Sequence, residues 1–216
     1  MAARELQASF EELADVAREK IGSRRYMLGI VGAPGAGKST LANYLTNELG
    51  TSAALVPMDG FHLANSVLEA LGRRNRKGAP DTFDAAGYVA LLRRLREDAS
   101  DIVYAPTFDR EIEESIGSAL PIDPRVPLII TEGNYLLLEE HPWNAIPELL
   151  DEIWYLTPDD SIRQERLIDR HIAFGKEPAA AREWALGTDE NNARVIHASS
   201  PRADVLVTIT SAELPT

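Results

Sequence analysis

The segment Gly32-Ala33-Pro34-Gly35-Ala36-Gly37-Lys38-Ser39-Thr40 is the most informative part of this sequence. It matches the phosphate-binding pattern G-x-x-x-x-G-K-[ST] at every fixed position. An apolar run precedes it at 26–31 and a helical pattern follows at 38–49, so the loop is expected to join a strand to a helix. In that setting backbone N–H groups hold phosphate, Lys38 reaches the β and γ oxygens, and Ser39 ligates magnesium. The loop predicts nucleotide binding.

Four more short apolar runs predict strands at 54–59, 126–132, 153–157 and 204–210. Most are apolar on both faces, as buried parallel strands must be. Helical stretches separate the runs, so we expect an α/β fold with a five-stranded parallel sheet. Residues 5–21 predict an amphipathic helix, because apolar residues recur there at spacings of three and four.

The whole chain, 1–216, is expected to form one domain. A long excursion at 60–125 interrupts the strand pattern, and loops of that length usually carry function. It contains one helical pattern near 85–98.

Charge and composition restrict the partners. The 216 residues carry a formal net charge of −12, which would repel nucleic acid and anionic membranes. The chain has no cysteine and no apolar run long enough to span a bilayer. We expect a cytoplasmic protein without nucleic-acid or membrane partners, and the sequence leaves open whether it forms a homodimer.

A phosphate-binding loop alone does not separate a switch, a motor and a kinase. A GTPase would normally carry Asn-Lys-x-Asp, and none of the four lysines has that setting. Asp84-Ala85-Ala86-Gly87 spells a GTPase motif but follows a polar loop, so we take it as coincidence. Asp59 closes the second predicted strand, at the sheet edge where ligands collect. It could be a general base for an attacking hydroxyl, or it could simply start a tight turn.

Four segments resemble the uridine kinase, pantothenate kinase and phosphoribulokinase family. They are Pro57-Met58-Asp59-Gly60-Phe61-His62, the stretch 76–84 ending in Pro-Asp-Thr-Phe-Asp, Ala105-Pro106-Thr107-Phe108-Asp109, and Thr131-Glu132-Gly133. Within this family the sequence resembles the bacterial proteins called putative fructose transport system kinases, which share its Asp-Gly-Phe-His, Arg-Lys-Gly-x-Pro and Glu-Gly-Asn-Tyr-Leu-Leu-Leu segments. The resemblance implies a three-layer P-loop kinase fold with sheet order 2-3-1-4-5 and a small helical lid at about 160–190. It also implies Asp59 as catalytic base.

Three further groups complete the expected catalytic site. Glu132 ends an apolar strand beside the loop and could hold Mg²⁺ through water, or merely cap the strand. Arg163, Arg166 and Arg170 share one face of a predicted helix. The family places arginines in its lid, and Arg166 and Arg170 match best. The alternative is a solvated face paired with Glu165 and Asp169.

For the acceptor we expect contacts from His62, Asp81, Asp109 and Arg110, of which Asp81 matches the family's ribose-binding aspartate. The segment after Asp109 is acidic where the uridine motif is basic, and Asp81, Asp84 and Asp109 can accept hydrogen bonds from hydroxyls. A neutral compound such as a sugar, for example fructose, is therefore favoured. The basic run 73–77 is either a solvated loop or a phosphate contact. By analogy of fold, Ser199 to Arg202 is expected to line the adenine pocket.

Together these features predict an ATP-dependent, Mg²⁺-requiring kinase for a small neutral metabolite. A nucleoside or pantothenate kinase, a nucleoside monophosphate kinase, and a nucleotide-binding regulatory protein without an acceptor stay open as alternatives.

Overall fold

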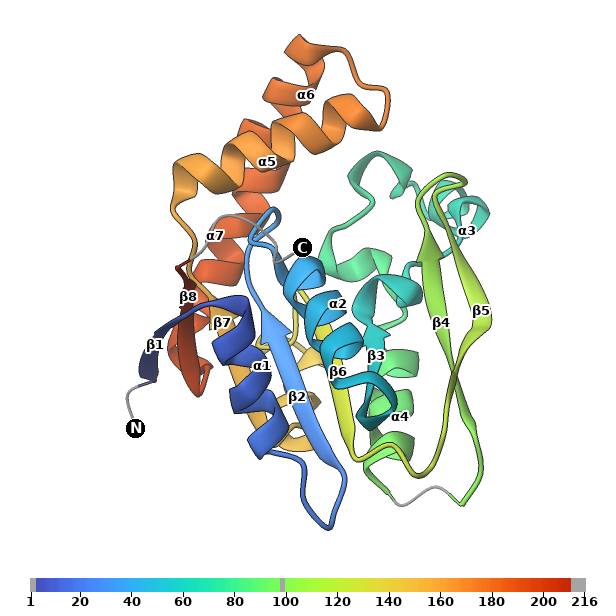
Figure 1. The fold of residues 1–216 in the computed structure, drawn as a ribbon. Helices are drawn as coiled ribbons and strands as arrows, with labels where there is room; N and C mark the ends of the chain where they lie inside the picture. Colours follow the sequence, from blue (N-terminus) through green and yellow to red (C-terminus); the bar gives the residue numbers. More distant parts are fainter. Residues whose placement is uncertain (1–2, 98–99, 211–216) are drawn as a thin grey trace.

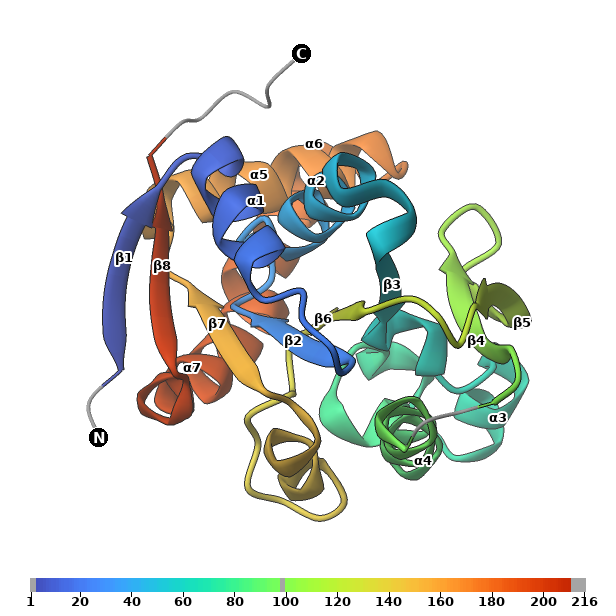
Figure 2. The same cartoon turned by 60° about the horizontal axis from the view of Figure 1, so that its bottom comes forward.

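The computed structural model describes residues 3–97 and 100–210. Its centre is a six-stranded parallel sheet in the order β1-β8-β7-β2-β6-β3 (Figures 1 and 2). The strands are β1 (Arg4–Ala8), β2 (Tyr26–Val31), β3 (Ala53–Pro57), β6 (Leu128–Gly133), β7 (Glu152–Leu156) and β8 (Val205–Ile209).

The expected order of five strands is confirmed, but the expected number is wrong. The strands predicted from the sequence correspond to β3, β6, β2, β7 and β8, which lie in that order. The sixth strand, β1, comes from the start of the segment 5–21 that we expected to be entirely helical. It pairs in parallel with β8 and extends the sheet on that side.

Ser9 separates the additional strand from helix α1 (Phe10–Glu19). The Ser9 side chain accepts a hydrogen bond from the backbone N–H of Glu12, and the Glu12 side chain accepts one from the backbone N–H of Ser9. This capping box fixes the helix start at Phe10. Leu6 packs against the same apolar cluster as α1, so its spacing fits a helix although it lies in a strand.

The two faces of the sheet are covered by different helices (Figure 2). Helices α1 and α2 (Lys38–Leu49) cover one face, where Leu13, Leu41 and Leu45 are fully buried. Helices α4 (Ala85–Arg96) and α7 (Glu190–Ala198) cover the other face, with a loop that contributes Trp143 and Ile146. This is the expected three-layer arrangement.

The excursion 60–125 contains a β-hairpin that no pattern in the sequence predicted. Its strands β4 (Val103–Asp109) and β5 (Glu114–Ile122) pair antiparallel and form a separate small sheet beside β3 (Figure 1). Helix α3 (Asn65–Ala70) and two short 3₁₀ turns, Arg74–Arg76 and Pro80–Thr82, precede α4. A further 3₁₀ turn, Met58–Phe61, leads from β3 into the excursion.

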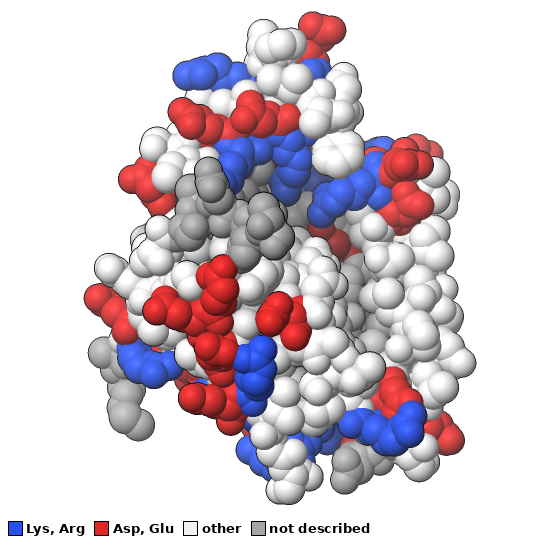
Figure 3. All heavy atoms as spheres, viewed as in Figure 1, with Lys and Arg blue, Asp and Glu red and all other residues white. Residues whose placement is uncertain are grey.

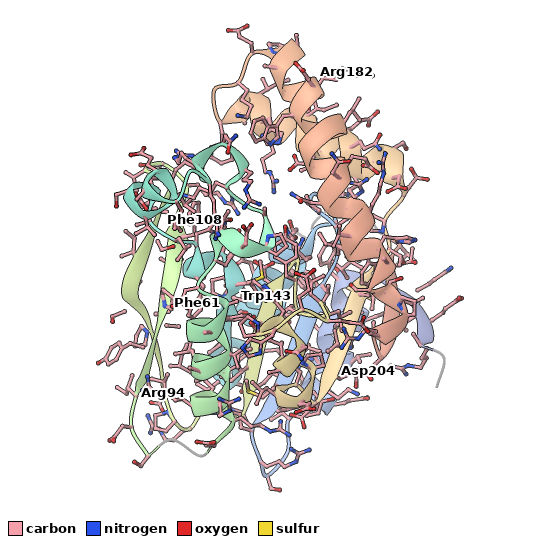
Figure 4. The ribbon with its side chains drawn as sticks, turned by 180° about the vertical axis from the view of Figure 1, so that it is seen from behind. Phe61, Arg94, Phe108, Trp143, Arg182 and Asp204 are labelled. Atoms are coloured by element: carbon pink, nitrogen blue, oxygen red, sulfur yellow. The ribbon has the colours of Figure 1, made fainter. Side chains whose placement is uncertain are left out.

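Helices α5 (Asp160–Ala173) and α6 (Pro178–Trp184) stand above the carboxyl ends of the strands (Figure 1). The turn between them contains Gly175, at φ 88°, where the sequence predicted the turn of the lid. A π-helical turn, Ala185–Asp189, then continues into α7. Figure 4 labels Arg182 on the outermost helix, Phe108 on the hairpin and Trp143 within the core. Among the described helices, none combines the length and apolar character that a membrane crossing requires.

Candidate active site

The phosphate-binding loop has the conformation that its glycines predict. Gly35 and Gly37 have φ values of 80° and 89°, in the left-handed region that favours glycine. A Cβ on Gly35 would lie 2.7 Å from the backbone oxygen of Arg163 in α5, so the loop and this helix are in close contact. Gly37 directly precedes α2, whose first N–H groups face the loop.

Lys38 and Glu132 are buried charged groups next to this loop, 8% and 5% exposed. Lys38 Nζ donates to the carbonyl oxygen of Ala33 at 3.1 Å. Burial lowers the pKa of Lys38 to about 8, although Glu132 and Asp59 act in the opposite direction. Burial raises the pKa of Glu132, and the neighbouring Asp59 raises it further. A bound cation would favour the ionised form of Glu132.

Ser39 Oγ donates to Glu132 Oε1 at 3.0 Å, which brings the two expected magnesium ligands together. Within the described ranges, no group of three or more His, Cys, Asp or Glu side chains could hold a metal by itself. Two oxygen ligands suit Mg²⁺, which usually binds through one or two protein groups, several waters and substrate phosphates. The residues present therefore fit a magnesium ion that arrives with a nucleotide.

A cavity of about 730 Å³ lies over the loop. Residues 35–40 form its phosphate end, and Arg110, Arg166 and Arg170 also line it. Six apolar residues line it as well, together with Asp159, Thr208 and Thr210; the apolar ones are Phe10, Leu156, Pro158, Ile162, Val207 and Ile209. Their apolar surface suits a nucleotide base. The expectation for residues 199–202 is not supported, since Ser199 is buried and Arg202 Nη1 donates to the carbonyl oxygen of Leu137 at 2.6 Å.

Asp59 lies directly after β3, as expected, in the 3₁₀ turn Met58–Phe61. Arg110 Nη2 donates to Asp59 Oδ2 at 3.0 Å and connects this turn to the end of the hairpin. Gly60 permits the approach, because a Cβ there would lie 2.5 Å from the carbonyl oxygen of Pro106. The Asp-Gly pair thus has two functions: it supplies a carboxylate and admits the hairpin.

Asp59 lines a second cavity, of about 450 Å³. Glu132 and residues of β3, α2 and the hairpin also line it. Ser39 and Arg110 line both cavities, so the two meet at these side chains. A group passing from one cavity to the other would pass between the phosphate-binding loop and Asp59.

The three arginines of α5 have different environments. Arg163 is 2% exposed and binds Asp160, Glu190 and the carbonyl oxygen of Pro34. Arg166 and Arg170 line the cavity over the phosphate-binding loop and, within 3–97 and 100–210, form no ion pair with an acidic side chain. Burial and the nearby Arg110 lower the pKa of Arg170. Arg163 therefore holds α5 against the phosphate-binding loop, while the side chains of the other two arginines face the cavity and are available to a phosphate. The alternative of a face paired with Glu165 and Asp169 is not what the structure shows.

The other expected acceptor contacts lie outside both cavities. Asp81 is ion-paired with Arg76 and Arg73. Asp84 caps α4 by accepting from the N–H of Gly87 at 2.8 Å. Asp109 accepts from the N–H groups of two residues in the hairpin turn. In this conformation the three aspartates bind neighbouring arginines or backbone N–H groups, and they do not lie beside Asp59.

His62 and the basic run 73–77 are also held by local contacts. The His62 ring packs between Phe83 and Phe108, with centroids 4.0 and 4.7 Å away, and Nδ1 donates to the carbonyl oxygen of Asp59 at 2.8 Å. Lys77 Nζ lies 2.8 Å from Asn65 Oδ1. His62 therefore positions the Asp59 turn against the hairpin. Neither the hairpin nor the contacts by which Arg163 joins α5 to the phosphate-binding loop were predicted from the sequence.

Proteins with similar sequences and structures are named as kinases of small molecules. No family model matches the chain. It is 33% identical over 195 residues to "Putative uridine kinase C227.14" of Schizosaccharomyces pombe, covering 86% of this chain and 82% of that protein. It is 26% identical over 212 residues to a pantothenate kinase of Rhizobium rhizogenes, covering 88% and 64%. The crystal structure of "putative fructose transport system kinase" from Silicibacter sp. TM1040 is similar with a TM-score of 0.82, at 37% identity over 92% of this chain and 98% of that one. The chain belongs to the family of P-loop kinases of small molecules that includes uridine kinase and pantothenate kinase.

Proposed function

We propose that this protein transfers the γ-phosphoryl group of ATP to a hydroxyl group of a small neutral metabolite. The observation that carries the proposal is the meeting of the two cavities at Ser39 and Arg110, with the phosphate-binding loop in one and Asp59 in the other. This arrangement provides one site for a nucleotide and another for an acceptor, with a carboxylate beside the acceptor.

In the proposed reaction, residues 35–40 and Lys38 bind the β- and γ-phosphates. The acceptor hydroxyl donates its proton to Asp59, and its oxygen attacks the γ-phosphorus as the bond to the β-phosphate oxygen breaks. ADP leaves with the negative charge that develops, which Lys38, Arg166 and Arg170 partly neutralise. Ser39 and Glu132 would hold Mg²⁺, which when bound shields the phosphate charges.

A neutral acceptor follows from where the charges in the second cavity lie. Its charged lining residues are Asp59, Glu132 and Arg110, and all three are at the catalytic end. Two of them are acidic, so a phosphate or carboxylate on the acceptor would meet repulsion there or uncharged walls elsewhere. A sugar such as fructose is the acceptor that we propose to test first, because of the name of the Silicibacter relative. The three aspartates that suggested a sugar no longer support it in this conformation.

The test is a coupled assay of ADP release with Mg·ATP across a library of sugars, polyols, nucleosides and vitamins. We expect acceptor-dependent release with a neutral hydroxyl compound and none with nucleoside monophosphates. Nucleotide binding without acceptor-dependent release by any compound would indicate a regulatory protein. Preference for a nucleoside monophosphate or a sugar phosphate would contradict the argument from charge.

A further inference from the structure

The second cavity extends well beyond Asp59, as a groove between α2 and the hairpin. One face of α2 forms its first wall through Ser39, Asn43 and Thr46, which lie three and four residues apart. The opposite walls are β3, through Ala54, Leu55 and Pro57, and β5, through Leu120, Pro121 and Ile122.

The groove is about 10 Å long by two independent measures. From Ser39 to Thr46, α2 rises by roughly 10 Å. From Pro57 back to Ala54, β3 covers about the same distance. Both elements lead away from the catalytic end in the same direction, since α2 begins and β3 ends at that edge of the sheet. A single sugar ring held at Asp59 would not reach the far end.

The walls of the groove beyond Asp59 are uncharged. Half of the fourteen lining residues are apolar, and the charged ones are those at the catalytic end. Leu55 and Leu120 are only half-buried, although each packs partly against a core cluster. From Ser115 to Ile122 the strand β5 has no charged residue, in a chain in which 26% of residues are charged. Figure 3 shows a hollow beside the uncharged face of the hairpin, with acidic atoms at its upper end and basic side chains above them.

We infer that the acceptor carries an uncharged, partly apolar substituent next to its reactive hydroxyl, and that this substituent binds in the groove between α2 and the hairpin. The inference rests on the proposed function, which places the hydroxyl at Asp59. Filling the groove removes the exposed apolar surface of Leu55 and Leu120 from water. Asn43 and Thr107 offer hydrogen bonds to an amide or ether, and Thr46, whose Oγ1 donates to the carbonyl oxygen of Ala42, can still accept one. A free sugar would be too short to make these contacts, and a charged substituent would lose its hydration against the uncharged walls.

The first test measures binding of the 1,2-alkanediols from propanediol to octanediol by calorimetry, with Mg²⁺ and a non-hydrolysable ATP analogue present. Each diol has the same hydroxyl head, and only the length of the apolar chain differs. We expect affinity to rise about three- to fourfold per methylene until the groove is filled. An affinity independent of chain length would overturn the inference.

Three variants locate the effect. Asn43→Arg puts a long charged side chain at an exposed position that lines the groove, and it should abolish the rise with chain length. Asn47→Arg is the matched control, since Asn47 is exposed on the same helix but does not line the groove, and it should keep the rise. An undiminished rise in Asn43→Arg would place the apolar site elsewhere and contradict the inference. Leu120→Ala, which opens rather than blocks the groove, should reduce the rise per methylene.

Turnover separates this inference from the proposed function. The comparison is kcat/KM for D-fructose and for its n-butyl glycoside, and we expect the glycoside to be at least tenfold better. If free fructose is phosphorylated as efficiently as the glycoside, the inference is wrong and the kinase assignment stands. If the diols bind as expected but no hydroxyl compound is phosphorylated, the proposed kinase function is wrong. The groove would then still be a binding site for apolar substituents.

Discussion

The guanidinium of Arg110 donates to Asp59 Oδ2 over 3.0 Å, and this bond joins the hairpin to the carboxyl end of β3. Both side chains are partly exposed, so the pair contributes at most about 1 kcal/mol to stability. Its importance lies in position, because Arg110 also lines the nucleotide cavity. The same guanidinium can hold the carboxylate of Asp59 and reach a phosphoryl group that approaches it.

We therefore predict that Arg110→Ala lowers kcat/KM for the acceptor by roughly tenfold to a hundredfold, in the range for losing one charge-stabilising group. The melting temperature should change little. Steady-state kinetics and a thermal melt check both parts, with Arg74→Ala as the control at a position that lines neither cavity. Equal effects of the two substitutions would remove Arg110 from the mechanism.

Lys38→Ala should abolish phosphoryl transfer and weaken nucleotide binding. Lys38 is held at the loop by the carbonyl oxygen of Ala33, and its pKa is already lowered by burial. Removing this buried charge should not destabilise the fold, so circular dichroism and the melting temperature should match the wild type. Activity above a tenth of wild type would show that the loop does not carry the reaction.

Arg163→Met should reduce stability rather than chemistry. Arg163 is 2% exposed and joins the carbonyl oxygen of Pro34 to Glu190 at the start of α7. Its loss should cost about 2–4 kcal/mol, or roughly 5–15 °C in melting temperature for a chain of this size. The control is Arg182→Met at an exposed position of α6. Similar melting temperatures for both variants would contradict the structural role.

His62 should make the protein less stable in mild acid. Burial lowers the pKa of His62 in the folded state, so the unfolded chain binds more protons between that pKa and the ordinary value of about 6.5. The free energy of unfolding should therefore fall as pH drops below about 6.5, by at most about 1.4 kcal/mol per pH unit from this group. Urea unfolding of wild type and His62→Asn at several pH values measures the difference.

The exposed His197 provides the control for that comparison. His197→Asn should follow the pH dependence of the wild type, whereas His62→Asn should lose part of its acid sensitivity. If the two variants show the same pH dependence, the buried position of His62 has no consequence for stability.

Much of the fold was predictable because local patterns and tertiary structure agree. The loop at 32–40, the five buried strands and their order, Asp59 after β3, and the Ser39–Glu132 pair all follow from motifs placed at the ends of apolar runs. The strand at Arg4–Ala8 was missed because Leu6 continues the apolar spacing of α1. The signal that could have found it is the capping box of Ser9 and Glu12, which begins the helix at Phe10.

The residues of the acceptor site were harder to predict, because the carboxylate of an aspartate in a loop can accept hydrogen bonds either from a ligand or from nearby backbone N–H groups. Asp84 and Asp109 cap a helix and a turn, and Asp81 binds neighbouring arginines. Sequence alone gives no reason to prefer these partners to a substrate. The groove between α2 and the hairpin is formed by segments more than fifty residues apart, so no local pattern could have indicated it.

The most direct test of the central claim is to measure Asp59→Asn twice, for turnover and for binding of Mg·ATP. Asn keeps the size of the side chain and can still contact Arg110, but it cannot accept the proton of the acceptor hydroxyl. We predict that turnover falls by about a hundredfold or more while the affinity for Mg·ATP stays within a few-fold. Turnover close to wild type would contradict the assignment of Asp59 as the base, and a parallel collapse of Mg·ATP binding would make Asp59 a magnesium ligand instead.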